Sequence, residues 1–171
     1  MTEATEAAFR EYAAAKLEQN LARIVDCLGR LNDEQIWQRA GNASNAPGNL
    51  ALHLSGNVRQ WILQGVDGQA DIRDRNAEFA ARGGVGRDAL LEGLRAVVAE
   101  AAAVIRSAQL DRPMSVQSYG ITVMEGIFHV VEHFSYHTGQ IVFLTKALLD
   151  VDLAYYTALD SADKPPYERI P

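Results

Sequence analysis

Apolar residues recur every three or four positions along four long stretches of the chain, and each stretch predicts an amphipathic helix. The first helix is expected over Thr5–Leu31, where charged side chains fill the positions between the apolar ones. The second is expected to open at Asn45 or Gly48, beside Pro47, because proline suits the first turn of a helix. It should end near Gly65.

The second half of the chain predicts two further helices. One covers Arg87–Gln109, and the other begins after Thr122 and ends near Leu149. Thr122 is followed three residues later by Glu125, which is the spacing of a capping box at a helix start. We therefore expect Thr122 to cap the fourth helix.

The segments between these helices are rich in turn-forming residues. DEQIW, at residues 33–37, predicts a short helical turn after the first helix. Residues 66–86 are polar and without a clear period, and they predict a connection of a length that usually has a functional role. Residues 111–120 form a connector, and the end of the chain predicts a Pro-rich, extended tail. No stretch alternates with period two for long enough to predict a sheet.

Four amphipathic helices without a sheet predict an all-α fold. The economical way to bury four apolar helix faces is a four-helix bundle, here with a long connection between the second and third helices. A chain of 171 residues has the size of one ordinary domain, so we expect a single domain over residues 1–171.

Composition narrows the classes of function. A net charge of −6 argues against non-specific nucleic-acid binding, which needs a basic surface. No apolar run approaches the roughly 20 residues of a membrane span, and the acidic start of the chain lacks the pattern of a signal peptide. The single cysteine, Cys27, fits a reducing compartment, and its place on an amphipathic helix predicts a buried structural thiol. We expect a soluble cytoplasmic protein that binds neither nucleic acid nor membranes.

The four histidines suggest a chemistry. His129, His133 and His137 follow one another at four-residue spacing on the fourth helix, so their Cβ atoms should lie about 5–6 Å apart on one face. With His133 as reference, the other two fall about 40° to either side, on a stripe that should face the bundle interior. His53 lies on the second helix and shares a face with Asn49 and Asn57.

Two explanations fit histidines on inward stripes. They can be core residues that hydrogen-bond to their neighbours, or they can bind a metal ion. A buried imidazole without a partner costs free energy, and stacked imidazoles repel one another when protonated. Metal coordination removes both problems, and the sequence alone leaves both explanations open.

Other metal-site patterns fit less well. HVVEH, at residues 129–133, matches an inverted zinc-protease motif with Glu132 as general base, but a bundle of this size offers little room for a peptide cleft. A di-iron bundle requires a histidine three residues after a glutamate on each of two helices. Phe128 and Ser135 occupy those positions after Glu125 and Glu132, so that pattern is absent.

Two segments, NLALHLSGNVRQWI and MEGIFHVVEHFSYHTGQIVFLTKALL, resemble the DinB/YfiT-like superfamily of metal-dependent bundle proteins. The order of elements agrees as well, with a histidine on the second helix and a spaced pair on the fourth. The resemblance implies a four-helix bundle, often a homodimer, and a divalent nickel, zinc, iron or manganese ion held by His53, His133 and His137. Some members of the superfamily are enzymes that use a low-molecular-weight thiol.

The resemblance leaves His129 outside the ligand set, and we expect it beside the ligands or in core packing. Asn49, Asn57, Tyr136 and Gln140 are candidates for orienting the ligands or a small-molecule substrate. Arg73, Asp74 and Arg75, in the long connection, are interpreted as a solvated charge run, with contact to a charged substrate as the alternative.

Three nitrogen ligands leave coordination positions open, as in catalytic metal sites, where an ion activates a water or holds a thiolate. The resulting hypothesis is a divalent-metal-binding protein that acts as a thiol-dependent S-transferase or a hydrolase. The alternative is a non-catalytic, dimeric stress-response or binding module whose histidines are structural.

Overall fold

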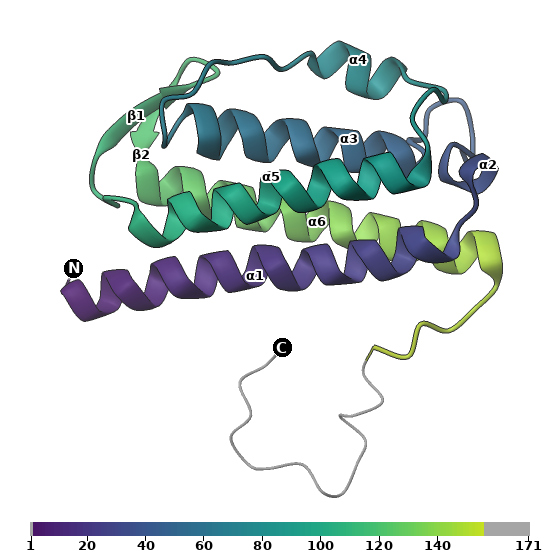
Figure 1. The fold of residues 1–171 in the computed structure, drawn as a ribbon, viewed down its shortest axis with the longest axis horizontal. Coiled ribbons are helices and arrows are strands. Elements are labelled where there is room, and N and C mark those ends of the chain that lie inside the picture. Colours follow the sequence, from purple (N-terminus) through teal and green to yellow (C-terminus); the bar gives the residue numbers. More distant parts are fainter. Residues whose placement is uncertain (1, 156–171) are drawn as a thin grey trace, which may run out of the picture.

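The computed structural model describes residues 2–155, and four long helices dominate it (Figure 1). The helices are α1 (Glu3–Arg30), α3 (Pro47–Val58) with its π-helical continuation η1 (Arg59–Gln64), α5 (Arg87–Ser107) and α6 (Val123–Leu149). α1 packs against α5 and α6, and α3 packs against the same two helices. The predicted all-α four-helix bundle is confirmed. The Pro-rich end of the predicted tail lies outside the described residues.

The helix starts follow from local hydrogen bonds. Thr122 caps α6 as predicted, because its Oγ1 accepts a hydrogen bond from Glu125 N and Glu125 Oε2 accepts one from Thr122 N. The start of α3 differs from the prediction, since Ala46 is the N-cap and Pro47 the first helical residue. Asn49 Oδ1 accepts a hydrogen bond from Ala46 N at 3.1 Å, so an amide in the first turn ties the helix start.

Short elements lie between the long helices. The predicted turn after the first helix is α2 (Asp33–Ile36). The long connection contains a helix that we did not predict, α4 (Arg75–Ala80), which Asp74 caps by accepting a hydrogen bond from Ala77 N at 2.9 Å. Asn49 Nδ2 donates to the carbonyl oxygens of Glu78 and Ala81, at 2.9 Å each. The connection is thereby fastened along α3.

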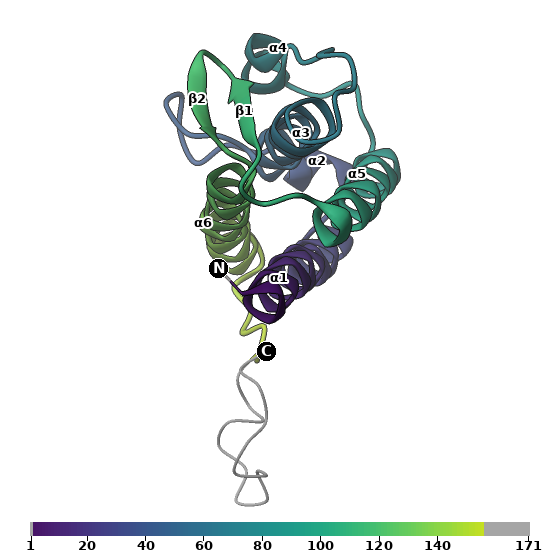
Figure 2. The same ribbon diagram turned by 90° about the vertical axis from the view of Figure 1, so that its left-hand side faces the viewer.

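The prediction that the chain forms no sheet is wrong for the connector before α6. β1 (Pro113–Val116) and β2 (Tyr119–Thr122) pair antiparallel. The two residues between the strands, Gln117 and Ser118, have φ angles of 49° and 69°, as a type I′ turn requires. Figures 1 and 2 show this hairpin and α4 on the α3 side of the bundle, away from α1.

The core is a continuous cluster of aliphatic side chains from all four long helices, with Phe134 its largest fully buried member. Cys27 is buried, as predicted, and burial raises the pKa of its thiol. Among the residues that the structure covers, no helix has both the length and the apolar character needed to cross a bilayer.

Two phenylalanines on α6 test how the bundle is stabilised. Phe134 is fully buried, whereas Phe128 is 64% exposed. Phe134→Ala should lower the free energy of unfolding by about 3–5 kcal/mol, because it removes buried apolar area and leaves a cavity. Phe128→Ala should change it by less than about 0.5 kcal/mol. Chemical denaturation of both variants checks this, and equal losses would contradict the described core.

Candidate metal centre

Three of the four histidines converge between α3 and α6. His53, His133 and His137 each offer a ligand nitrogen, and these three nitrogens lie within 4.8 Å of one another. His53 Nε2 and His133 Nε2 are 2.9 Å apart, and the ring centroids of His133 and His137 are 4.5 Å apart. His53 is only 4% exposed. The face predicted from helical spacing is therefore the face on which the imidazoles meet.

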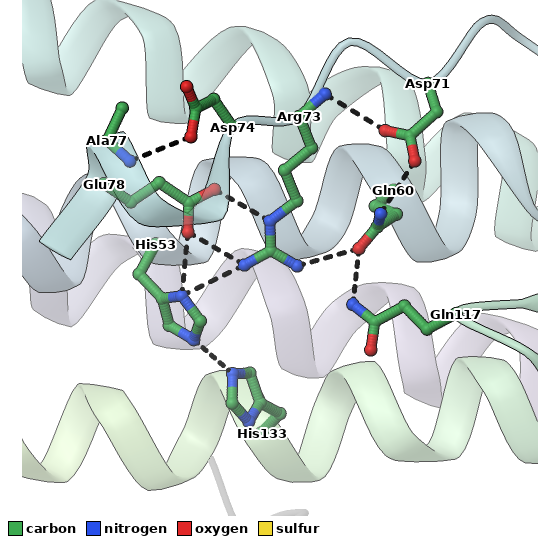
Figure 3. Close-up of polar contacts among 9 residues, drawn as sticks. All are labelled: His53, Gln60, Asp71, Arg73, Asp74, Ala77, Glu78, Gln117 and His133. Atoms are coloured by element: carbon green, nitrogen blue, oxygen red, sulfur yellow. Dashed lines mark hydrogen bonds and ion pairs between the residues drawn. The ribbon is translucent and has the colours of Figure 1, made fainter.

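Glu78, on α4, orients His53. Its Oε2 lies 3.0 Å from His53 Nδ1, and Arg73 Nη2 lies 3.0 Å from the same nitrogen (Figure 3). A guanidinium only donates and a carboxylate only accepts, so the contact with Glu78 is a hydrogen bond in the tautomer that carries its proton on Nδ1. His53 Nε2 is then left with a lone pair that faces His133. A carboxylate behind a histidine is the arrangement that fixes ring tautomer and orientation in metal sites.

Arg73 holds the Glu78 carboxylate in place. Its Nε donates to Glu78 Oε1 at 2.7 Å and its Nη2 donates to Oε2 at 2.9 Å, while Nη1 donates to Gln60 Oε1 at 3.0 Å (Figure 3). The Arg73 side chain is 2% exposed. Burial raises the pKa of Glu78, but hydrogen bonds and charge from Arg73 and His53 outweigh it and hold that pKa below its usual range. Glu78 is therefore ionised at neutral pH.

His137 has an orienting partner on its own helix. Its Nδ1 lies 2.6 Å from Gln140 Oε1, to which it donates, so His137 Nε2 also keeps a lone pair. Of the other candidates, Tyr136 is mostly exposed, with its ring 5.1 Å from that of His137. Gln140 thus makes the kind of contact that we expected of an orienting residue.

His129 lies outside the group of converging nitrogens. Its ring stacks on that of His133, with centroids 5.5 Å apart, and packs against the Trp61 ring at 4.1 Å. The two asparagines that were predicted on the helix face of His53 make different contacts. Asn49 fastens the long connection, whereas Asn57 lines a cavity next to the histidines.

Two residues of the site, Glu78 and Arg73, were missed or misinterpreted from the sequence. Arg73 belongs to the predicted solvated charge run, and for this residue the interpretation is wrong because its side chain is buried in an ion pair. Asp74 and Arg75 are exposed, as expected. The available signal was Asp74 at a helix N-cap, which would have placed Glu78 on a short helix.

The imidazoles of α6 are held in their neutral form. Burial, followed by the charges of His137, His53, His129 and Arg73, lowers the pKa of His133 to about 3. Burial also lowers the pKa of His137, although its hydrogen bond to Gln140 opposes that shift. Neutral imidazole is the form that binds metal ions.

The donor set fits a divalent ion. Two nitrogens bound to one zinc ion lie at most about 4 Å apart, so the converging nitrogens need only a small displacement to share one ion. Two of the three rings have a hydrogen-bond acceptor at Nδ1, which leaves Nε2 for the ion. A cavity of about 480 Å³ adjoins His53 and His133, so an ion held there could be reached by a small molecule.

Comparison with known proteins agrees with this geometry. The model of a family described as "Protein of unknown function (DUF1572)" matches residues 5–159. The chain belongs to this family. No curated protein matches the chain.

Two solved structures share the fold of this DUF1572 protein. One is a conserved protein from Enterococcus faecalis, with a TM-score of 0.68 and 13% identity over 82% of this chain and 96% of that one. The other is a DinB-like protein from Bacillus cereus ATCC 10987, with a TM-score of 0.60 and 16% identity over 75% of this chain and 85% of that one. The expected resemblance to DinB-like proteins is confirmed for the fold, which is all that structures at these identities show.

Gly56 tests the contact between α3 and Glu78. A Cβ at this position would overlap the Glu78 carboxylate and lie 3.0 Å from Arg73 Nε, so Gly56→Ala should push the carboxylate away from His53. We expect the free energy of unfolding to fall by about 1–3 kcal/mol, because buried charged groups lose hydrogen bonds. A matched control is Gly93→Ala on α5, where a Cβ meets nothing within 4 Å. The free energy of unfolding of this control variant should rise by about 0.5–1 kcal/mol. A rise in both variants would contradict the described contact between α3 and Glu78.

The lowered pKa of His133 predicts a pH dependence of the metal-free protein. The unfolded chain protonates this residue near pH 6.5 and the folded chain only near pH 3, so the unfolded state binds more protons between these values. The free energy of unfolding should therefore fall as the pH drops from 6.5 towards 3. In His133→Gln the fall should be shallower, by up to about 1.4 kcal/mol per pH unit. Urea denaturation across this range, in the presence of chelator, measures both slopes. Identical slopes would show that His133 titrates alike in both states.

Proposed function

We propose that this protein binds one divalent metal ion through His53, His133 and His137 and uses it as a metal-dependent enzyme. The observation that carries the proposal is the convergence of three imidazole nitrogens, with two of the rings in contact with an oxygen through Nδ1, beside a cavity that His53 and His133 line. A histidine set that served packing alone would not need a buried carboxylate paired with arginine behind one ring.

The bound ion would supply Lewis acidity to a water or thiol at an open coordination position. The chain's own residues would do the remaining work. Glu78 would keep His53 in the tautomer that presents Nε2, and Arg73 would neutralise the charge of Glu78. Gln140 would hold His137 in the tautomer that presents its own Nε2. The His129 ring packs against both the Trp61 ring and the His133 ring, and all three residues line the cavity.

The reaction class is the finer part of the proposal. We propose a thiol-dependent S-transferase or a hydrolase acting on a small molecule, in a cytoplasmic homodimer. The likeness to the DinB/YfiT-like superfamily supports the thiol and the dimer, and nickel, zinc, iron and manganese are the candidate ions. The buried thiol of Cys27 is part of the core cluster, so the thiol in such a reaction would come from a separate molecule.

Metal content tests the proposal directly. Protein purified without a histidine tag should contain about one divalent ion per chain by elemental analysis, and a chelator should lower its melting temperature. His53→Ala, His133→Ala and His137→Ala should each reduce occupancy by about tenfold or more, because two nitrogens hold an ion far more weakly than three. His129→Ala is the matched control, one helical turn from His133, and should keep the ion.

Two outcomes would contradict the proposal. Full occupancy in the double variant His133→Ala, His137→Ala would place the ion elsewhere. A chelator that changes neither metal content nor melting temperature would favour the alternative, a non-catalytic binding module with structural histidines. Loss of the ion in His129→Ala with retention in His137→Ala would instead favour the peptidase motif.

A further inference from the structure

The outer face of α6 carries exposed aromatic side chains. Among residues 2–155, the large apolar side chains that are exposed include three on α6 and none on α5, although both helices belong to the bundle. The three are Phe128, Tyr136 and Phe143, with exposures of 64%, 60% and 71%. Figure 2 shows α6 at one edge of the bundle, and its packed side contacts α1 and α3. Large apolar side chains on the outer side of such a helix indicate a second surface that covers them.

The exposed residues from 132 to 146 follow the spacing of a helix–helix contact. Steps of three or four positions connect them, and every exposed residue in this range belongs to the same stripe of the helix. The members of this α6 stripe are Glu132, Ser135, Tyr136, Gly139, Phe143 and Lys146. The stripe has an acidic end, a basic end and aromatic residues between them.

Gly139 lies at the middle of the α6 stripe, seven residues after Glu132 and seven before Lys146. A Cβ at this position would meet nothing within 4 Å, so the fold of the single chain does not require glycine here. Glycine weakens a helix relative to alanine, but the missing side chain lets another helix approach closely. The position is therefore suited to the crossing point of a second helix.

The α6 stripe is complementary to itself. A second copy of α6 that crosses at Gly139 about a two-fold axis runs antiparallel, so each residue before Gly139 faces the residue equally far after it. Glu132 then faces Lys146 of the second copy, and Ser135 faces its Phe143. Opposite charges meet at both ends, and a small side chain meets a large one near the axis. A parallel pair would instead bring like charges together.

Both charges are available for this pairing. Glu132 makes no ion pair among residues 2–155. Lys146 has a long one, since its Nζ lies 3.9 Å from Asp152 Oδ1 and the two side chains are 50% and 83% exposed. An exposed pair of this kind contributes little to stability, so Lys146 loses little when it turns to another carboxylate.

The α6 stripe also lies next to the histidine site. The Tyr136 ring is 5.1 Å from the ring of His137, a proposed metal ligand. Gln140, which accepts a hydrogen bond from His137, lines a hollow of about 500 Å³ together with Tyr136, Gly139 and Phe143. A second copy on the stripe would cover Tyr136 and border this hollow.

We propose that the α6 stripe binds the same stripe of a second copy of this chain, in an antiparallel pair with two-fold symmetry. Phe143 packs on Ser135 and Gly139 of the second copy, and Glu132 pairs with its Lys146. The two-fold axis makes each of these contacts twice. The inference rests on the proposed function for the homodimer, and it gives that dimer a surface and a register.

Sedimentation velocity of the full chain tests the pairing. Wild-type protein should form a dimer whose fraction rises with concentration. Gly139→Gln should raise the dimer dissociation constant by about a hundredfold, because a side chain at the crossing holds the helices apart and separates the aromatic contacts. Gly93→Gln on α5 is the matched control, since a Cβ there also meets nothing within 4 Å, and it should leave the constant unchanged. Circular dichroism shows whether each variant is folded.

Charge reversal tests the antiparallel register. Glu132→Lys places lysine opposite lysine at both ends of the pair, and Lys146→Glu places glutamate opposite glutamate. Each variant alone should dimerise about tenfold more weakly than wild-type protein. An equimolar mixture of the two variants should form a heterodimer about as tight as the wild-type dimer, because every lysine then meets a glutamate. High salt should reduce these differences.

Three results would overturn the inference. They are wild-type protein that stays monomeric, a Gly139→Gln variant that dimerises as well as Gly93→Gln, and a mixture of the charge variants that associates no better than either alone. If Gly139→Gln fails to fold, the charge variants decide the question, because both of their positions are exposed.

The metal content of the same samples separates this inference from the proposed metal site. An ion held by a monomeric protein would contradict the pairing and leave the metal site standing. Pairing through the α6 stripe in a protein that takes up no ion would contradict the metal site alone.

Discussion

The ion pair between Glu78 and Arg73 is the interaction on which the histidine site depends. A carboxylate buried beside an imidazole is costly unless a cation and hydrogen bonds compensate it, and Arg73 supplies both. The pair belongs to the connection between α3 and α5, outside the four long helices. The bundle therefore brings the histidines together, and the connection places the charged pair against Nδ1 of His53. A bundle with a short loop at this point would bring together the same three imidazoles but would lack the Glu78–Arg73 pair behind His53.

Much of the fold and the inward face of the histidines follow from the sequence, because both depend on local periodicity. Amphipathic spacing places the long helices to within a few residues, and the Thr122–Glu125 pair marks the start of α6, since a capping box needs only neighbouring residues. Four-residue spacing likewise puts His133 and His137 on one stripe. Their meeting with His53 required knowledge of how two helices pack, which the likeness to a known superfamily supplied.

The remaining parts of the site were not predictable, because they depend on contacts between distant residues. Glu78 reaches His53 across 25 positions, and nothing local distinguishes it from a surface glutamate. The hairpin was missed because its turn is formed by Gln117 and Ser118, where a type I′ turn usually has asparagine and glycine. Gly56 resembles an ordinary helix glycine until the Glu78 carboxylate is seen to lie against it.

Asn49 changes how the chemistry of this fold should be inferred from related sequences. It shares a helix face with His53, so an alignment would present it as a companion of the histidines. Its amide instead joins the first turn of α3 to the last turn of α4, through Ala46, Glu78 and Ala81. An asparagine retained at this position in other members of the family would therefore report that the connection keeps its course. Divergent reactions could share that asparagine, and a common substrate should not be inferred from it.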